Sequence, residues 1–124
     1  FHQETTWIQA EAECQHHWRG AHLVSIHSDE ENNMLAQYIK REHRKTNPIW
    51  IGLSDPQQNR CWRWSDHSPF TFRAWDKGQP NNLTGNEYCA GKSIDTSFQK
   101  WHDYPCDYRF SFICKRKPYG KQVA

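Results

Sequence analysis

The sequence predicts an α+β fold, because two helical segments come first and short strands follow them. Apolar residues recur at helical spacing up to about residue 40, and from residue 48 onward they form short alternating or buried runs. A third observation is the segment 76–86, which is rich in glycine, asparagine and proline and has neither pattern. A loop of this length inside a compact domain is usually functional. Helices followed by a group of strands are typical of the α+β class.

The first predicted helix begins after Thr6, a suitable N-terminal cap, and ends before Gly20. Residues 21–26 then alternate like a strand. The second helix follows Ser28, and Glu31 at its third position completes a predicted capping box. The apolar stripe of the first helix is Trp7, Ala10, Cys14 and Trp18, and the predicted buried face of the second is Met34, Leu35, Tyr38 and Ile39.

The second half of the chain predicts short strands around an aromatic core. Pro48 precedes a short buried strand at 50–53, and the alternation near residue 62 places Trp62 and Trp64 on one face. Further strands are expected around Cys89, at 100–102 and at 110–115. Because the chain has 7 Trp, 5 Tyr and 6 Phe but few aliphatic residues, we expect its core to depend on aromatic packing, which Phe70, Phe72 and Trp75 continue.

Composition limits the classes of function. The 124 residues are enough for one domain, 1–124, and the chain starts in what reads as a strand, so we expect a trimmed or processed N-terminus. The mean hydropathy of −1.08 and the lack of a long apolar run predict no membrane span. The net charge of +2 is too small to indicate nucleic-acid binding. Eight histidines occur without an HExxH motif, so we expect no metalloenzyme.

Five cysteines without a CxxC spacing favour disulfides over zinc, and therefore an oxidising, extracellular compartment. The odd number leaves one thiol over.

The order and spacing of these motifs resemble the C-type lectin-like domain over almost the whole chain. The resemblance implies a double-loop fold, a secreted and non-enzymatic protein, and disulfides Cys14–Cys114 and Cys89–Cys106. The matching segments are Thr6-Trp7, 10–14, 21–26, 50–53, 62–66, Cys89, Trp101-His102-Asp103, Cys106 and 112–115.

Two branches of this family are similar to the chain, and the sequence leaves both open. The C-terminal segments 98–101 and 112–115 look like the regenerating-islet (Reg-type) lectins. Cys61, just before Trp62, looks like the cysteine that bridges two subunits in snake-venom C-type lectins. Cys61 is therefore a candidate for an inter-chain disulfide that makes a homo- or heterodimer, and the alternative is a free or locally paired thiol.

The family implies a calcium site at Gln79, Asn81, Glu87 and Asp103, because it holds calcium with a Glu-Pro-Asn or Gln-Pro-Asp loop, a later Glu and a Trp-Asn-Asp strand. The same residues, together with His102, are the implied sugar-binding residues. His102 stands where the family has asparagine, and imidazole is a poor calcium ligand. Gln79 and Asn81 are both amides, so the sequence does not choose between mannose-type and galactose-type specificity.

The resemblance thus predicts a calcium-dependent carbohydrate-binding lectin whose partners are glycans or glycoproteins. Asn82 begins an N-glycosylation sequon beside the site. The alternative is a non-catalytic protein-binding module of the venom type, a disulfide-linked dimer that acts on haemostatic proteins or receptors and has weak or lost sugar binding.

Overall fold

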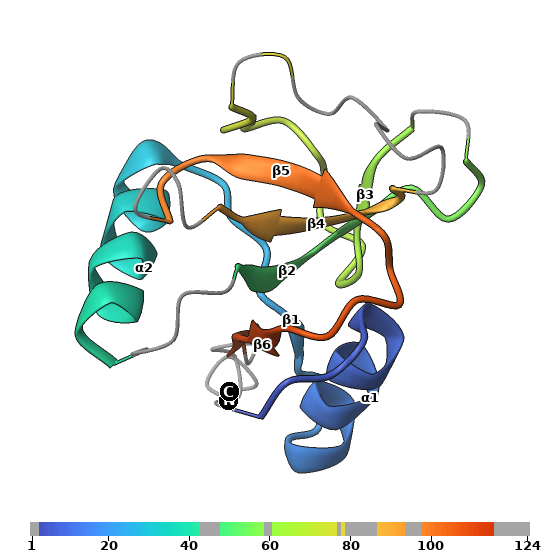
Figure 1. The fold of residues 1–124 in the computed structure, drawn as a ribbon. Helices are drawn as coiled ribbons and strands as arrows, with labels where there is room; N and C mark the ends of the chain where they lie inside the picture. The colour runs from blue at the N-terminus through green and yellow to red at the C-terminus, as the bar shows by residue number, and fades with distance from the viewer. Residues whose placement is uncertain are drawn as a thin grey trace, which may run out of the picture.

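The computed structural model describes residues 3–42, 48–58, 61–76, 78, 87–93 and 98–115, and it confirms the α+β fold. In Figure 1 the strands lie in the middle of the molecule, with α2 on one side and α1 on another. Within these residues, neither helix has the length and apolar composition needed to cross a membrane. The elements are α1 (Trp7–His17), β1 (His22–Leu23), α2 (Asp29–Glu42), β2 (Ile49–Ser54), β3 (Arg63–Trp64), β4 (Cys89–Lys92), β5 (Trp101–Tyr104), β6 (Ser111–Phe112) and β7 (Cys114–Lys115).

Five strands form the larger sheet, in the order β3-β2-β4-β5, and β6 pairs with β2 in parallel. β1 and β7 form a separate antiparallel pair. The pairing of β4 with β5 is antiparallel and sets Cys89 opposite Tyr104 and Ala90 opposite Asp103. This register determines how the predicted site residues meet.

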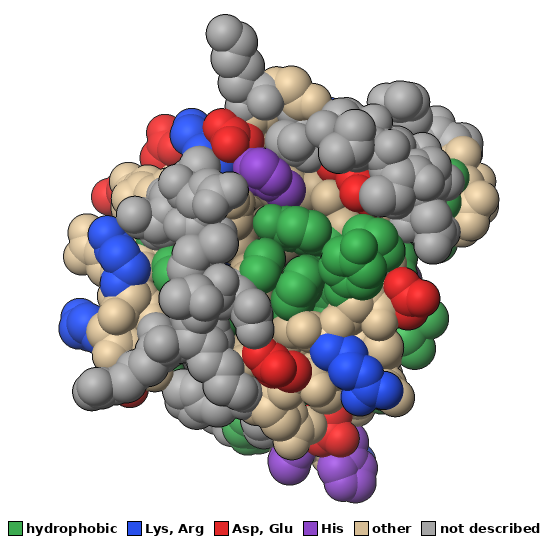
Figure 2. Space-filling view, viewed as in Figure 1, with side chains coloured by type: hydrophobic (Ala, Val, Ile, Leu, Met, Phe, Trp, Pro, Cys, Tyr) green, Lys and Arg blue, Asp and Glu red, His purple; other side chains and the backbone are tan. Residues whose placement is uncertain are grey.

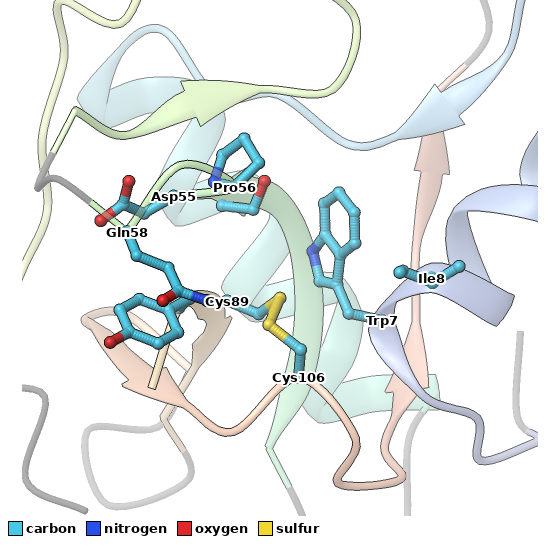
Figure 3. Close-up of a pocket in the computed structure, with 9 residues that line it drawn as sticks. Trp7, Ile8, Asp55, Pro56, Gln58, Cys89 and Cys106 are labelled. Carbon is cyan, nitrogen blue, oxygen red and sulfur yellow. A yellow bond between two sulfur atoms is a disulfide. The ribbon is translucent and has the colours of Figure 1, made fainter. Parts of the chain in front are cut away.

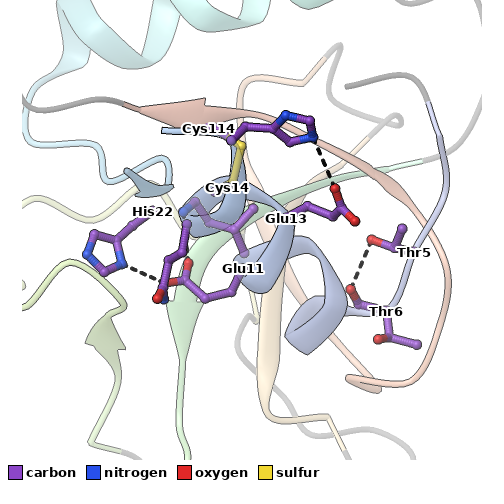
Figure 4. Close-up of a disulfide and its surroundings, with 10 residues drawn as sticks. Thr5, Thr6, Glu11, Glu13, Cys14, His22 and Cys114 are labelled. Atoms are coloured by element: carbon purple, nitrogen blue, oxygen red, sulfur yellow. Dashed lines mark hydrogen bonds and ion pairs between the residues drawn. A yellow bond between two sulfur atoms is a disulfide. The ribbon is translucent and has the colours of Figure 1, made fainter. Parts of the chain in front are cut away.

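Two disulfides hold the fold, and both have the predicted pairing. Cys14–Cys114 joins α1 to β7 across a sequence separation of 100, as Figure 4 shows. Cys89–Cys106 joins the start of β4 to the turn after β5 across a separation of 17.

The helix α1 begins where the sequence predicted. The Thr6 hydroxyl accepts a hydrogen bond from the backbone N–H of Gln9, and the Gln9 side chain accepts one from the Thr6 N–H. Ala10 and Cys14 are fully buried, so the predicted stripe faces the core.

The start of α2 differs in detail from the predicted capping box. The Ser28 hydroxyl accepts from the Glu31 N–H at 3.1 Å, as expected for an N-cap. The Glu31 carboxylate, however, accepts from the backbone N–H of His27 at 2.7 Å and not from that of Ser28. Its other oxygen pairs with Lys115 Nζ at 3.2 Å, so Glu31 also ties α2 to β7.

The predicted buried face of α2 was partly wrong. Met34 and Tyr38 are 62% and 48% exposed, whereas Ile39 is buried as predicted and Leu35 is partly buried. The buried positions of the helix are Asn32, Ala36 and Ile39.

Asn32 occupies the core because its amide pairs with two buried donors and one partly buried carbonyl. Its Oδ1 accepts from Lys92 Nζ at 2.5 Å and from Trp101 Nε1 at 3.1 Å, and its Nδ2 donates to the Gln99 carbonyl at 2.7 Å. A buried polar group without a partner is costly, so these bonds set which face of α2 turns inward.

The strand predicted at 21–26 is shorter than expected, because only His22–Leu23 pairs regularly with β7. The backbone of the next residue, Val24, bonds to two different segments. Its N–H donates to the Ile113 carbonyl, and its carbonyl accepts from the Gly52 N–H in β2, both at 2.9 Å. Val24 therefore does not continue the regular pairing of β1 with β7.

The aromatic core is confirmed. Trp64 and Trp101 are buried and meet edge to face, with ring centroids 5.6 Å apart. Trp75 packs in the same manner on Trp101 at 5.8 Å and on Trp62 at 5.0 Å. Phe70 and Phe72 are partly buried against this cluster.

Candidate functional site

Three of the predicted site residues lie where β4 and β5 meet. Glu87 comes two residues before β4 and is 8% exposed, and Asp103 lies in β5 and is 4% exposed. His102 precedes Asp103, and 21% of its side chain is exposed. The predicted residues Gln79 and Asn81 lie outside the described residues.

The register of the two strands places both carboxylates at one end of the strand pair. Asp103 is opposite Ala90, near the start of β4, and Glu87 lies just before that start. A buried carboxylate is costly unless hydrogen bonds or a cation compensate for the lost hydration. Glu87 and Asp103 lie near the same end of the strand pair and are therefore candidates for cation ligands, as the family pattern predicts.

The two carboxylates do not complete a metal site by themselves. Within the described residues, no group of three or more His, Cys, Asp or Glu side chains is arranged to hold a metal ion. Their hard oxygen donors suit calcium, which takes six to eight oxygen ligands. A complete calcium site therefore needs further oxygen ligands besides Glu87 and Asp103.

His102 contacts a residue that the sequence did not indicate. Its Nε2 lies 2.9 Å from Asp76 Oδ2, and its ring stacks on Tyr104 at an interplanar angle of 17°. Asp76 is 26 residues away in the sequence, so no motif spacing links the two. The only indication in the sequence was that Asp76 is the first residue of the segment 76–86.

A separate apolar pocket of about 210 Å³ lies beside the Cys89–Cys106 disulfide (Figure 3). Tyr88, the neighbour of Glu87, is one of its walls, and the indole of Trp7 is another. Figure 2 shows hydrophobic side chains gathered on the face between β5 and α1. The pocket can accept a small apolar group. It is lined by Trp7, Ile8, Ser54, Asp55, Pro56, Gln58, Tyr88, Cys89 and Cys106.

Two further predictions concern covalent chemistry. Cys61 is exposed and belongs to neither disulfide, and its inter-chain bond stays a prediction. The sequon at Asn82 lies outside the described residues.

Comparison with known proteins identifies the family. The profile of the "Lectin C-type domain" matches residues 3–116. A "C-type lectin" of Micrurus corallinus is 42% identical over 115 residues, which cover 93% of this chain and 73% of the relative. A "C-type lectin mannose-binding isoform" of Oxyuranus scutellatus is 40% identical with the same coverage of both chains.

Among solved structures, human lithostathine superposes with a TM-score of 0.86 at 37% identity, covering 93% of this chain and 86% of its own. Both the snake relatives and the lithostathine likeness agree with the two branches that the sequence resembles. The sequence profile, the relatives and the shared fold lead to one conclusion: this chain belongs to the C-type lectin domain family.

Proposed function

We propose that this protein is a calcium-dependent carbohydrate-binding lectin whose calcium ligands are Glu87, Asp103, Gln79 and Asn81. The observation that carries the proposal is the pair of buried carboxylates at one end of β4 and β5. Gln79 and Asn81 belong to the segment that leads directly into Glu87. The family is one of non-enzymatic binding proteins, which agrees with the expectation that the chain is not an enzyme.

The charge of this site favours weak calcium binding. Glu87 and Asp103 are the only charged groups among the four proposed ligands. Fewer carboxylates lower calcium affinity, and extracellular modules work at dissociation constants of roughly 10⁻⁴ to 10⁻³ M. We therefore expect calcium affinity in that range.

A bound calcium ion would supply two coordination positions for neighbouring hydroxyls of one sugar. A ligated hydroxyl needs an acceptor for its proton and a donor toward its free lone pair. The Glu87 carboxylate is the acceptor, and the amides of Gln79 and Asn81 are the donors. The name of the mannose-binding relative supports mannose as the first sugar to test.

The test is glycan-array binding with calcium and then with a chelator, on the wild type and on Glu87→Gln and Asp103→Asn. Each substitution removes one charged oxygen and should weaken calcium-dependent binding at least about tenfold. Asp107→Asn is the matched control, since it makes the same chemical change at an exposed position after β5. Binding that persists in chelator would contradict the proposal and favour the protein-binding module.

We also propose that residues 1–124 form one domain of a secreted protein, and that Cys61 links two copies. The two disulfides support secretion, because such bonds persist in oxidising compartments. The exposure of Cys61 supports the link, and two joined copies would raise the avidity of a weak site. A gel without reductant should show a dimer that Cys61→Ser abolishes. A wild-type protein that migrates as a monomer without reductant would contradict the link.

Glycosylation at Asn82 is a proposal with its own measurement. A mass decrease after treatment with an amidase that removes N-linked glycans would support it, and an unchanged mass would contradict it.

A further inference from the structure

Asp76, the first residue of the segment 76–86, contacts His102 in β5. The Asp76 carboxylate lies 2.9 Å from His102 Nε2, and the exposed fractions of the two side chains are 33% and 21%. Asp76 therefore sits beside a residue of the proposed sugar site without being one of the proposed ligands.

The backbone holds Asp76 in place. Its N–H donates to the Trp101 carbonyl at 3.1 Å, and the preceding residue, Trp75, forms a parallel bridge with Trp101. Trp101 directly precedes His102 in β5, so the same part of the strand positions both Asp76 and His102. Trp75 also packs edge to face on Trp101, with ring centroids 5.8 Å apart.

This contact determines which nitrogen of His102 carries the proton. An ionised carboxylate only accepts hydrogen bonds, so the nitrogen that faces it must be the donor. In a neutral ring the other nitrogen, Nδ1, is then an acceptor. No described residue donates a hydrogen bond to Nδ1, and the stacking on Tyr104 fixes the plane of the ring.

We propose that Asp76 is a positioning residue of the sugar site, which holds His102 with its proton on Nε2 and presents Nδ1 as a hydrogen-bond acceptor to a sugar hydroxyl. The inference rests on the proposed lectin function and deepens it. The asparagine that the family has at this position carries an NH₂ donor. With Nδ1 as an acceptor in addition to the Glu87 carboxylate, the site would select a sugar hydroxyl that donates toward His102.

The first test is ¹⁵N NMR of the His102 ring, followed toward alkaline pH until its chemical shifts no longer change, so that the neutral ring is observed. In the wild type the chemical shifts should show a protonated Nε2 and an unprotonated Nδ1. In Asp76→Ala the proton should be distributed over both nitrogens, while the control Asp107→Asn should match the wild type. A wild-type ring with its proton on Nδ1 overturns the proposal.

The second test is calcium-dependent binding of the best glycan from the array. Loss of one such hydrogen bond is worth about 1 kcal/mol, so Asp76→Ala should lose about fivefold to tenfold in affinity. Calcium affinity, measured by calorimetry without sugar, should stay within about twofold. In the His102→Asn background, which restores the family residue, Asp76→Ala should have no effect on sugar affinity.

The outcomes separate the two proposals. A wild type that binds no sugar with calcium defeats the lectin function, and this inference with it. A wild type that binds while Asp76→Ala binds equally well defeats only the role of Asp76. An equal loss from Asp76→Ala in the wild-type and the His102→Asn backgrounds would make Asp76 a general structural residue and also overturn its positioning role.

Discussion

At the scale of single residues, Lys92 places an amine in the core of the protein. Its side chain is fully buried, and its Nζ donates to Asn32 Oδ1 at 2.5 Å and to the Phe98 carbonyl at 3.0 Å. These acceptors are neutral. Burial lowers the pKa of Lys92 from 10.5 to about 7, because the charged form loses its hydration in the core.

Stability should therefore rise with pH above neutrality. Between the folded pKa of about 7 and the unfolded value of 10.5, the unfolded state binds the proton and the folded state does not. The free energy of unfolding should increase by about 2 kcal/mol between pH 7 and pH 9, and fall as the pH is lowered through that window.

Urea unfolding at both pH values measures this difference. Lys92→Met should remove most of the pH dependence, and Lys40→Met, at an exposed position of α2, should retain it. Equal pH dependence in Lys92→Met and wild type would show that Lys92 is not the group responsible.

At the scale of elements, the start of α2 joins a helix cap to a tertiary contact. Ser28 accepts from the Glu31 N–H, while the Glu31 carboxylate connects the His27 backbone to Lys115 on β7. The cap therefore positions Glu31 as well as starting the helix. Because these contacts lie at the helix N-terminus, acidic side chains there are also favourable toward the helix dipole.

Ser28→Ala should lower the free energy of unfolding by about 1 kcal/mol, the usual cost of losing an N-cap hydroxyl. Ser28→Asp keeps an acceptor at the same place and should remain within about 0.5 kcal/mol of wild type. Chemical denaturation of the three proteins provides the measurement. If Ser28→Asp were as destabilised as Ser28→Ala, the hydrogen bond would not be the source of the loss.

At the scale of the whole molecule, the two disulfides close loops of very different length. The separations are 100 residues for Cys14–Cys114 and 17 for Cys89–Cys106. Loop-closure entropy predicts that the longer bond contributes about 4 to 5 kcal/mol and the shorter about 3 kcal/mol. A Cys14→Ser, Cys114→Ser variant should thus lose more stability than Cys89→Ser, Cys106→Ser. The reverse order in thermal melts would show that strain or residual unfolded structure outweighs chain entropy.

The fold was predictable from the sequence to the extent that its signals are local or belong to a family pattern. Thr6 and Ser28 marked the helix starts, the tryptophans marked the core, and the cysteine order of the family gave both disulfides. The buried face of α2 was not predictable, because Asn32 is placed by partners on β4 and β5. Hydrophobic periodicity cannot detect a polar residue that is buried for its hydrogen bonds.

The candidate site was predictable to a similar extent. The family motif indicated Glu87 and Asp103, and the strand register places both at one end of β4 and β5. The ligand roles of all four residues stay predictions, and Gln79 and Asn81 also lie outside the described ranges. Asp76 was missed because its contact with His102 spans 26 residues and depends on the Trp75–Trp101 bridge.

The long covalent link between α1 and β7 has a practical consequence for anyone who handles this protein. A protease that cuts once between Cys14 and Cys114 leaves two fragments that remain one molecule of nearly unchanged mass. Such nicked material would migrate as intact on a gel run without thiol, wherever between the two cysteines the cut lay. Batches should therefore be judged intact only after reduction.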